Sequence, residues 1–195
     1  MLIMLKVMIV DNDLKRSKPL KQSLIDSGFE VIAHVKNDVA LDSKCRELQP
    51  DVVIMDVDSP SRDTLENICV ISMHDARPIV MFAHDGDKEK IKAATQAGVS
   101  AYVVGTIPSE RLIPVIDAAI ARFEEFKSLR NELALANTKL DERKTIERAK
   151  GLLMRQRNVD EDEAYKMLRN IAMQRKIKLA DLAKQLVEAA KMLIV

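Results

Sequence analysis

The sequence has few cysteines: Cys45 and Cys69 are too few for a disulfide framework. We interpret both as reduced thiols, with Cys45 on a predicted helix. No apolar run approaches the roughly 18 residues that a membrane-spanning helix needs. The first residues, MLIMLKVMIVDND, have neither a basic n-region nor a small-residue cleavage site, so no signal peptide is predicted. These absences predict a cytoplasmic protein with no membrane partner.

Motifs that carry catalysis are also missing. The sequence has no Gly-rich phosphate loop, no nucleophile elbow and no zinc motif. His34, His74 and His84 do not combine with the cysteines at metal-ligand spacing. Since no complete catalytic constellation is present, we do not expect an enzyme and expect no required cofactor.

Charge is present but unevenly divided. Residues 1–125 contain 15 Lys and Arg against 20 Asp and Glu, a net charge of −5, whereas residues 126–195 contain 16 against 10, a net charge of +6. This asymmetry predicts two parts with different partners. The basic part has only one aromatic residue after Phe126, namely Tyr165, which argues against recognition through a row of stacking platforms.

The first part alternates short apolar runs with helical stretches. Strands are predicted at 5–10, 30–35, 52–56, 78–83 and 101–105, with helices near 14–27, 38–48, 61–73 and 87–97 and from about 108. Alternation of this kind predicts a five-stranded parallel sheet covered on both faces. Right-handed crossovers restrict it to a doubly wound, flavodoxin-like α/β fold, which we place at residues 1–122.

A long helix is predicted next, because residues 109–157 are rich in helix-forming residues and contain no proline after Pro114. Its linker part, 109–145, carries an apolar repeat of seven residues, which predicts a coiled-coil seam of about two to three heptads. The predicted seam consists of Ala119, Phe126, Leu129, Leu133, Ala136 and Leu140. We expect it to form a homodimer; the alternative is that it packs back on the first domain.

A small all-α, three-helix module is predicted at 140–195. Asp160 and Glu163 have the spacing of a capping box that starts a helix over about 161–175. The basic stretch RKIK, 175–178, makes the turn, and Leu179, Leu182, Ala183, Leu186, Ala190 and Leu193 give the last helix an apolar face. Three such segments can close a bundle core.

The stretch PDVVIMDVDSP, residues 50–60, places Asp56 at the carboxyl end of a buried strand, where open α/β sheets bind ligands. On these residues, and on the VDND that ends the first strand, the first domain resembles a response-regulator receiver domain. The resemblance implies that Asp56 is the phosphoacceptor and that Asp11, Asp56 and Asp58 hold Mg²⁺, Asp58 through its backbone carbonyl.

Three of the receiver site positions depart from the family pattern. Asn12 stands in place of the second acid, Ala83 in place of the switching Thr or Ser, and Gly105 in place of the lysine. Each change removes a charge or a donor that would stabilise a phosphoryl group. We therefore expect the acidic scaffold to dock a protein partner. The alternative is a phosphorylation-driven two-component regulator that acts through Asp56.

The basic module is predicted to bind a polyanion, because its cations gather on a compact unit of net positive charge. In IERAKGLLMRQRN, residues 146–158, we expect Ile146, Ala149 and Leu153 to face the core. Our predicted RNA-binding residues are Arg148, Lys150, Arg155, Arg157, Arg169 and Arg175. The alternative, for any one of them, is a solvated helix face, and for the chain an interaction scaffold with no nucleic-acid role.

Residues 140–193 resemble the ANTAR domain, an RNA-binding output module, on AKGLLM at 149–154 and LADLA at 179–183. The order of receiver, long helix and ANTAR domain is most similar to NasT- and AmiR-like antitermination regulators. The resemblance implies a dimer that binds paired hairpin loops of a leader RNA. It also implies a ligand-sensing protein partner that gates the dimer, and target genes for nitrate or nitrite assimilation.

Overall fold

The computed structural model describes residues 4–13, 17–37, 41–105 and 108–192. The chain divides into two compact units, Met1–Lys127 and Ser128–Val195. None of the described helices contains a stretch that is both long and apolar enough to cross a membrane.

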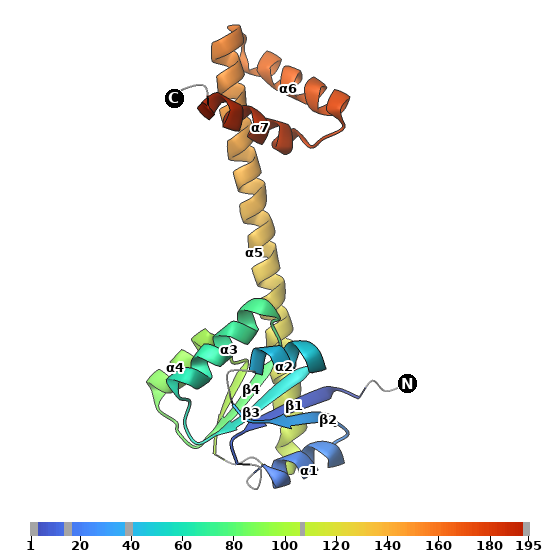
Figure 1. Ribbon diagram of the computed structural model, residues 1–195, viewed down its shortest axis with the longest axis vertical. Coiled ribbons are helices and arrows are strands. Elements are labelled where there is room, and N and C mark those ends of the chain that lie inside the picture. The colour runs from blue at the N-terminus through green and yellow to red at the C-terminus, as the bar shows by residue number, and fades with distance from the viewer. Residues whose placement is uncertain (1–3, 14–16, 38–40, 106–107, 193–195) are drawn as a thin grey trace. The chain divides into compact units, whose positions relative to one another are not determined.

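The first unit alternates strands and helices (Figure 1). Its elements are β1 (Lys6–Asp11), α1 (Lys18–Asp26), β2 (Glu30–Val35), α2 (Leu41–Leu48), β3 (Val52–Val57), α3 (Arg62–His74), β4 (Ile79–Ala83), α4 (Lys88–Ala97) and β5 (Ala101–Val104). Each predicted strand is present to within a residue at either end. Residues 14–16 and 38–40, where two predicted helices begin, lie outside the described residues.

The five strands form one parallel sheet in the order β2-β1-β3-β4-β5. This is the order of the doubly wound flavodoxin-like fold, so the predicted fold class is confirmed. Alternate residues of each strand face opposite sides of the sheet. One face packs on α2, α3 and α4 through Leu41, Ile68 and Ala94, and the other packs on α1 and the first turns of α5 through Leu24 and Ile116.

Helix ends in this unit follow local chemistry. The Asp87 side chain accepts hydrogen bonds from the backbone N–H groups of Glu89 and Lys90 and so begins α4. Gly98 ends α4 with φ of 120°, and a Cβ there would lie 2.1 Å from Ser72 Oγ. Both the backbone angle and the close approach to α3 therefore require glycine at this position.

Helix α5 (Ser109–Arg157) begins in the first unit and continues into the second. Ala119 is only 1% exposed, because it packs in the core of the first unit with Leu112 and Ile116. The prediction that Ala119 belongs to an intermolecular seam was therefore wrong, because the core of the first unit already covers this residue. Phe126, Leu129, Leu133, Ala136 and Leu140 are exposed within this chain.

The second unit packs the end of α5 against α6 (Glu161–Arg175) and α7 (Leu179–Met192). Its core contains Ala149, Leu153, Leu168 and Ala183, with Ile146 partly buried against them, as predicted. The Asp160 side chain accepts a hydrogen bond from the Glu163 N–H at 2.8 Å and begins α6. The predicted residue Leu193 lies outside the described residues.

Candidate functional site

The carboxyl ends of β1 and β3 bring two predicted metal ligands together. Asp11 and Asp56 are register partners in the parallel pairing of these strands. Asp11 is fully buried, and its Oδ1 accepts a hydrogen bond from the Asp13 N–H at 2.8 Å, whereas Asp56 is partly exposed. The sequence therefore located this acidic edge of the sheet correctly.

Asp58, the third predicted ligand, is placed differently. Its side chain is 82% exposed, and Oδ1 lies 3.6 Å from His84 Nδ1. Its backbone carbonyl accepts hydrogen bonds from the N–H groups of His84 at 3.1 Å and Asp85 at 3.2 Å. These two bonds use both lone pairs that the carbonyl could offer to a cation.

A Mg²⁺ ion at this edge would need near-octahedral oxygen coordination. Asp11 and Asp56 supply carboxylates, but Asn12 replaces an acid and the Asp58 carbonyl is hydrogen-bonded elsewhere. Among the described residues, no group of three His, Cys, Asp or Glu side chains is placed to hold a metal ion. Because Mg²⁺ usually keeps several waters and needs only one or two carboxylates, Asp11 and Asp56 would be the residues that hold the ion at this edge.

Asn12 instead ties two loops together. Its Oδ1 accepts a hydrogen bond from the Asn37 N–H at 3.1 Å. Asn37 in turn donates from Nδ2 to Thr64 Oγ1 at 2.7 Å and accepts from Asn67 Nδ2 at 3.1 Å, both on α3. The residue that stands in place of an acid thus helps to fix the surroundings of Asp56.

Ala83 and Gly105 are joined to each other through their backbone groups. The Ala83 carbonyl accepts a hydrogen bond from the Gly105 N–H at 2.8 Å, and Ala83 is buried. Gly105 has φ of 81°, a region that a lysine adopts only at a cost. Neither residue has a side-chain donor for a phosphoryl oxygen, so the site lacks two of the groups that would stabilise one.

A polar network near this edge escaped the sequence interpretation. Lys90 Nζ donates to Asp85 Oδ2 at 2.6 Å and to Ser59 Oγ at 2.8 Å, and the Tyr102 hydroxyl donates to the Asp85 carbonyl at 2.6 Å. The hydrogen bond from Lys90 lowers the pKa of Asp85 to about 2. The available signal was HDGDKEK at 84–90, in which acids precede a lysine on the first turn of a helix.

Among the described residues, the histidines and cysteines belong to no group placed to hold a metal ion. His34 Nε2 is 2.9 Å from Ser17 Oγ, and His74 Nδ1 is 3.4 Å from Asp42 Oδ2. Burial raises the pKa of the Cys45 thiol to about 11, so this thiol is protonated at neutral pH. Cys69 is exposed.

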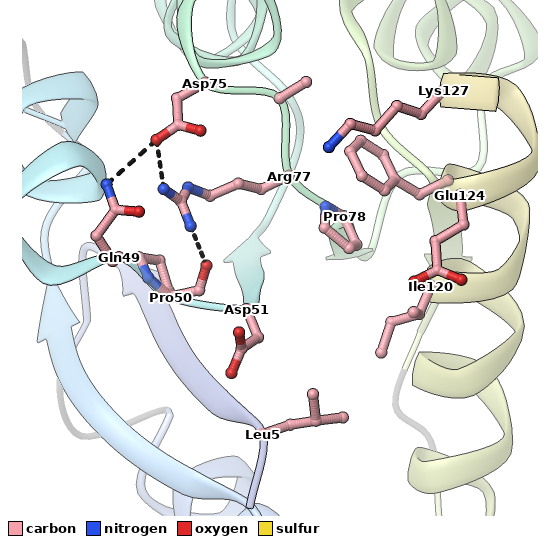
Figure 2. Close-up of a pocket in the computed structure, with 12 residues that line it drawn as sticks. Leu5, Gln49, Pro50, Asp51, Asp75, Arg77, Pro78, Ile120, Glu124 and Lys127 are labelled. Atoms are coloured by element: carbon pink, nitrogen blue, oxygen red, sulfur yellow. Dashed lines mark hydrogen bonds and ion pairs between the residues drawn. The ribbon is translucent and has the colours of Figure 1, made fainter. Parts of the chain in front are cut away.

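A cleft of about 340 Å³ lies at the opposite end of the sheet, before the starts of β1, β3 and β4. Figure 2 shows the Arg77 guanidinium between the Asp75 carboxylate and the Pro50 carbonyl, both of which accept its hydrogen bonds. Lys127 Nζ lies 5.8 Å from the centroid of the Phe123 ring. Since Asp75 and Pro50 already accept hydrogen bonds from Arg77, these contacts stabilise the first unit.

In the second unit, five of the six predicted RNA-binding residues are exposed. We call them the exposed arginine set: Arg148, Arg155, Arg157, Arg169 and Arg175. They come from the last turns of α5 and from α6. Arg155 Nε donates to the Gly151 carbonyl at 3.1 Å, which leaves its terminal nitrogens outside that contact. Arginine side chains exposed in this way can contact phosphates bidentately.

Lys150, the sixth predicted residue, is not available in the same way. It is 7% exposed, and its Nζ contacts Glu161 Oε1 at 2.6 Å and Glu147 Oε2 at 2.9 Å. Hydrogen bonds to Glu161 and then Glu147 raise the pKa of Lys150, and the Tyr165 ring centroid lies 6.0 Å from Nζ. Lys150 therefore joins α5 to α6, which corrects its predicted role as an exposed contact.

Comparison with known proteins gives two family matches. Residues 7–117 match the response regulator receiver domain, and residues 134–187 match the ANTAR domain. The transcriptional regulatory protein PdtaR of Mycobacterium tuberculosis strain H37Rv is 30% identical over 183 residues, which cover 94% of this chain and 89% of PdtaR.

The first unit alone has further relatives. The chemotaxis protein CheY of Bacillus subtilis is 28% identical over 116 residues, which cover 59% of this chain and 97% of CheY. The solved structure of the chemotaxis response regulator CheY4 of Vibrio cholerae aligns with a TM-score of 0.52 at 25% identity, over 60% of this chain and 99% of that one.

Proposed function

Because the chain belongs to the response regulators that join a receiver domain to an ANTAR domain, we propose that it is an RNA-binding regulator of transcription antitermination. In this chain the receiver match, residues 7–117, precedes the ANTAR match, residues 134–187. The placement of the chain among NasT-like regulators stays a prediction.

The exposed arginine set carries this proposal. Five guanidinium groups project from a compact helical unit, residues 128–195, whose net charge is +5. Hairpin loops of RNA present phosphates and unpaired bases outside the deep groove of the double helix. Surface guanidinium groups can reach those phosphates, and such contacts supply affinity that depends on salt. Charge alone favours a polyanion, and the resemblance to antitermination regulators implies that this polyanion is a leader RNA with paired hairpin loops.

Dimerisation through α5 completes the proposal. Phe126, Leu129, Leu133 and Leu140 are each more than half exposed at heptad spacing on one helix. An exposed apolar repeat of this kind favours a coiled coil with a second copy. Two ANTAR domains in one dimer would bind the two hairpins of one leader together, and linked binding raises the affinity for paired hairpins above that for one.

Control is proposed to come from a ligand-sensing protein partner. The groups that would stabilise a phosphoryl at Asp56 are replaced by Asn12, Ala83 and Gly105, which hold loops and backbone instead. A receiver fold with a fixed acidic edge can still present a surface for docking. The partner would release the dimer on binding nitrate or nitrite, and the target genes would serve their assimilation.

Capture of RNA crosslinked to the protein in cells tests this proposal. We expect recovered transcripts to carry paired hairpins upstream of nitrogen-assimilation genes. A matched variant, Arg155→Ala with Arg169→Ala, should recover them poorly, because the exposed arginine set is reduced. Recovery of transcripts without hairpins, at equal yield from both proteins, would overturn the assignment.

A further inference from the structure

Tyr165 on α6 is the one aromatic residue of the sequence after Phe126. Its neighbours Ala164, Leu168 and Ala172 are buried in the core of the second unit, whereas Tyr165 is 41% exposed. An aromatic ring that only filled the core would be covered by it. This ring instead presents part of its surface to solvent from the border of the α6 face that packs on the core, close to Lys150 of α5.

The ring is also held in place. Lys150 Nζ lies over it, 6.0 Å from its centroid, within the range of a cation–π contact. Lys150 is itself fixed by Glu161 at 2.6 Å and Glu147 at 2.9 Å. The lysine supports the ring from one side, while its charge is balanced by the two glutamates. An exposed ring that is already ordered loses little entropy when a flat ligand stacks on it.

Cations flank the ring on the same helix. Arg169 lies four residues further along α6, one turn away, and Lys166 adjoins the ring in sequence; both are exposed. Ring and guanidinium together match the two chemical parts of a nucleotide, a flat base and an anionic phosphate. Proteins that bind single-stranded RNA combine aromatic platforms with cations in this manner.

We propose that Tyr165 stacks on one unpaired base of a bound RNA loop, with Arg169 on the adjoining phosphate. This inference rests on the proposed RNA-binding function and adds a base-binding position to it. The scarcity of aromatics excludes a row of stacking platforms, but it leaves room for one. Each subunit would then order one extruded loop base, and affinity would depend on the loop as well as on charge.

Substitutions at Tyr165 test the inference on the full-length protein with a two-hairpin leader RNA. Tyr165→Phe keeps the flat ring and should bind as the wild type does. Tyr165→Leu keeps an apolar side chain without a ring and should weaken binding about fivefold or more. Thermal unfolding of each variant establishes that the second unit remains folded at the temperature of the binding assay. Equal affinity of the Phe and Leu variants would overturn the proposal.

A second variant gives a direct readout. The chain has no tryptophan, so Tyr165→Trp provides tryptophan emission from this position alone. Added RNA should quench that emission with the same midpoint that filter binding reports for the complex. Unchanged emission during measurable binding would overturn the proposed stacking by Tyr165 but would leave the proposed RNA-binding function intact. Absence of filter binding by the wild type would instead remove the proposed function, and this inference with it.

Discussion

In the receiver domain the polar groups near Asp56 are engaged with their own chain, whereas in the ANTAR domain the exposed arginine set faces solvent. Asn12 holds Asn37, the Asp58 carbonyl accepts two backbone hydrogen bonds, and Lys90 binds Asp85. Arg148, Arg157 and Arg169 are exposed on their helices. Two domains that are both rich in charge thus place it differently: one engages it in contacts between its own loops, and the other exposes it to solvent.

The difference between the domains suggests how they divide their work. An acidic edge whose loops are held by hydrogen bonds within the chain would suit recognition by another protein. A set of exposed guanidinium groups suits an extended anion. Substitutions on α5, at Lys150 and at the acidic edge of the receiver domain test this difference between the domains.

The largest effect is expected for the seam of α5. Leu133→Ser removes an apolar side chain that each copy would bury in the dimer, and this should weaken self-association about a hundredfold or more. Sedimentation equilibrium measures it. Leu135→Ser is a matched control, because Leu135 is 63% exposed and Leu133 62%, but Leu135 lies outside the heptad positions. Equal weakening by both substitutions would argue against the seam.

A smaller effect is expected for Lys150, which resembles the receiver residues in being engaged internally. Lys150→Met should lower the stability of the ANTAR domain by about 1–2 kcal/mol, because two charge-assisted contacts are lost and both glutamates are partly exposed. Thermal unfolding at neutral pH measures this loss. Arg155→Ala, a control on the same helix, should leave stability unchanged. A Lys150→Met protein that is as stable as the wild type would instead favour the original prediction that Lys150 contacts RNA.

The pH dependence of that loss has a definite sign. Because the glutamates raise the pKa of Lys150 above that of an ordinary lysine, its contribution is fully present below the ordinary value. It is lost only as pH rises through the raised pKa, in the alkaline range. The stability difference between Lys150→Met and the wild type should therefore stay constant from about pH 6 to about pH 8.

A still smaller effect is expected at the acidic edge of the receiver domain. Lys90 lowers the pKa of Asp85 to about 2, from 3.8, so this pair stabilises the fold above the ordinary aspartate pKa. Lys90→Met should reduce stability at neutral pH, and the deficit should shrink as pH falls from about 4 towards 2. Lys92→Met, at an exposed position of the same helix, is the control. A deficit that stays constant down to pH 2 would contradict the assigned ion pair.

No effect is expected for Asp56 itself. Asp56→Asn should bind leader RNA as the wild type does, and acetyl phosphate with Mg²⁺ should give no stoichiometric phosphoryl adduct by intact mass. The alternative, a regulator driven by phosphorylation, predicts an adduct on the wild type that Asp56→Asn lacks. Such an adduct, with a change in RNA affinity, would replace control by a docked partner.

Sequence alone was sufficient for elements whose signals are local. The runs ending at Asp11 and Asp56 predicted strands, and parallel pairing then placed both carboxylates at one edge. Contacts between elements could not be predicted from the sequence. The Lys150–Glu161 bond depends on how α6 meets α5, and the burial of Ala119 depends on how far the sheet covers α5. Heptad spacing and charge report neither, because they describe one helix at a time.

The most direct test of the division between the two domains is the salt dependence of leader-RNA binding by the full-length protein. The logarithm of the association constant should fall linearly with the logarithm of salt concentration, and Arg155→Ala with Arg169→Ala should reduce that slope by about 1.4–1.8. Arg46→Ala with Arg62→Ala, which removes two exposed receiver arginines, should leave the slope unchanged. Equal slopes for all three proteins would contradict the account.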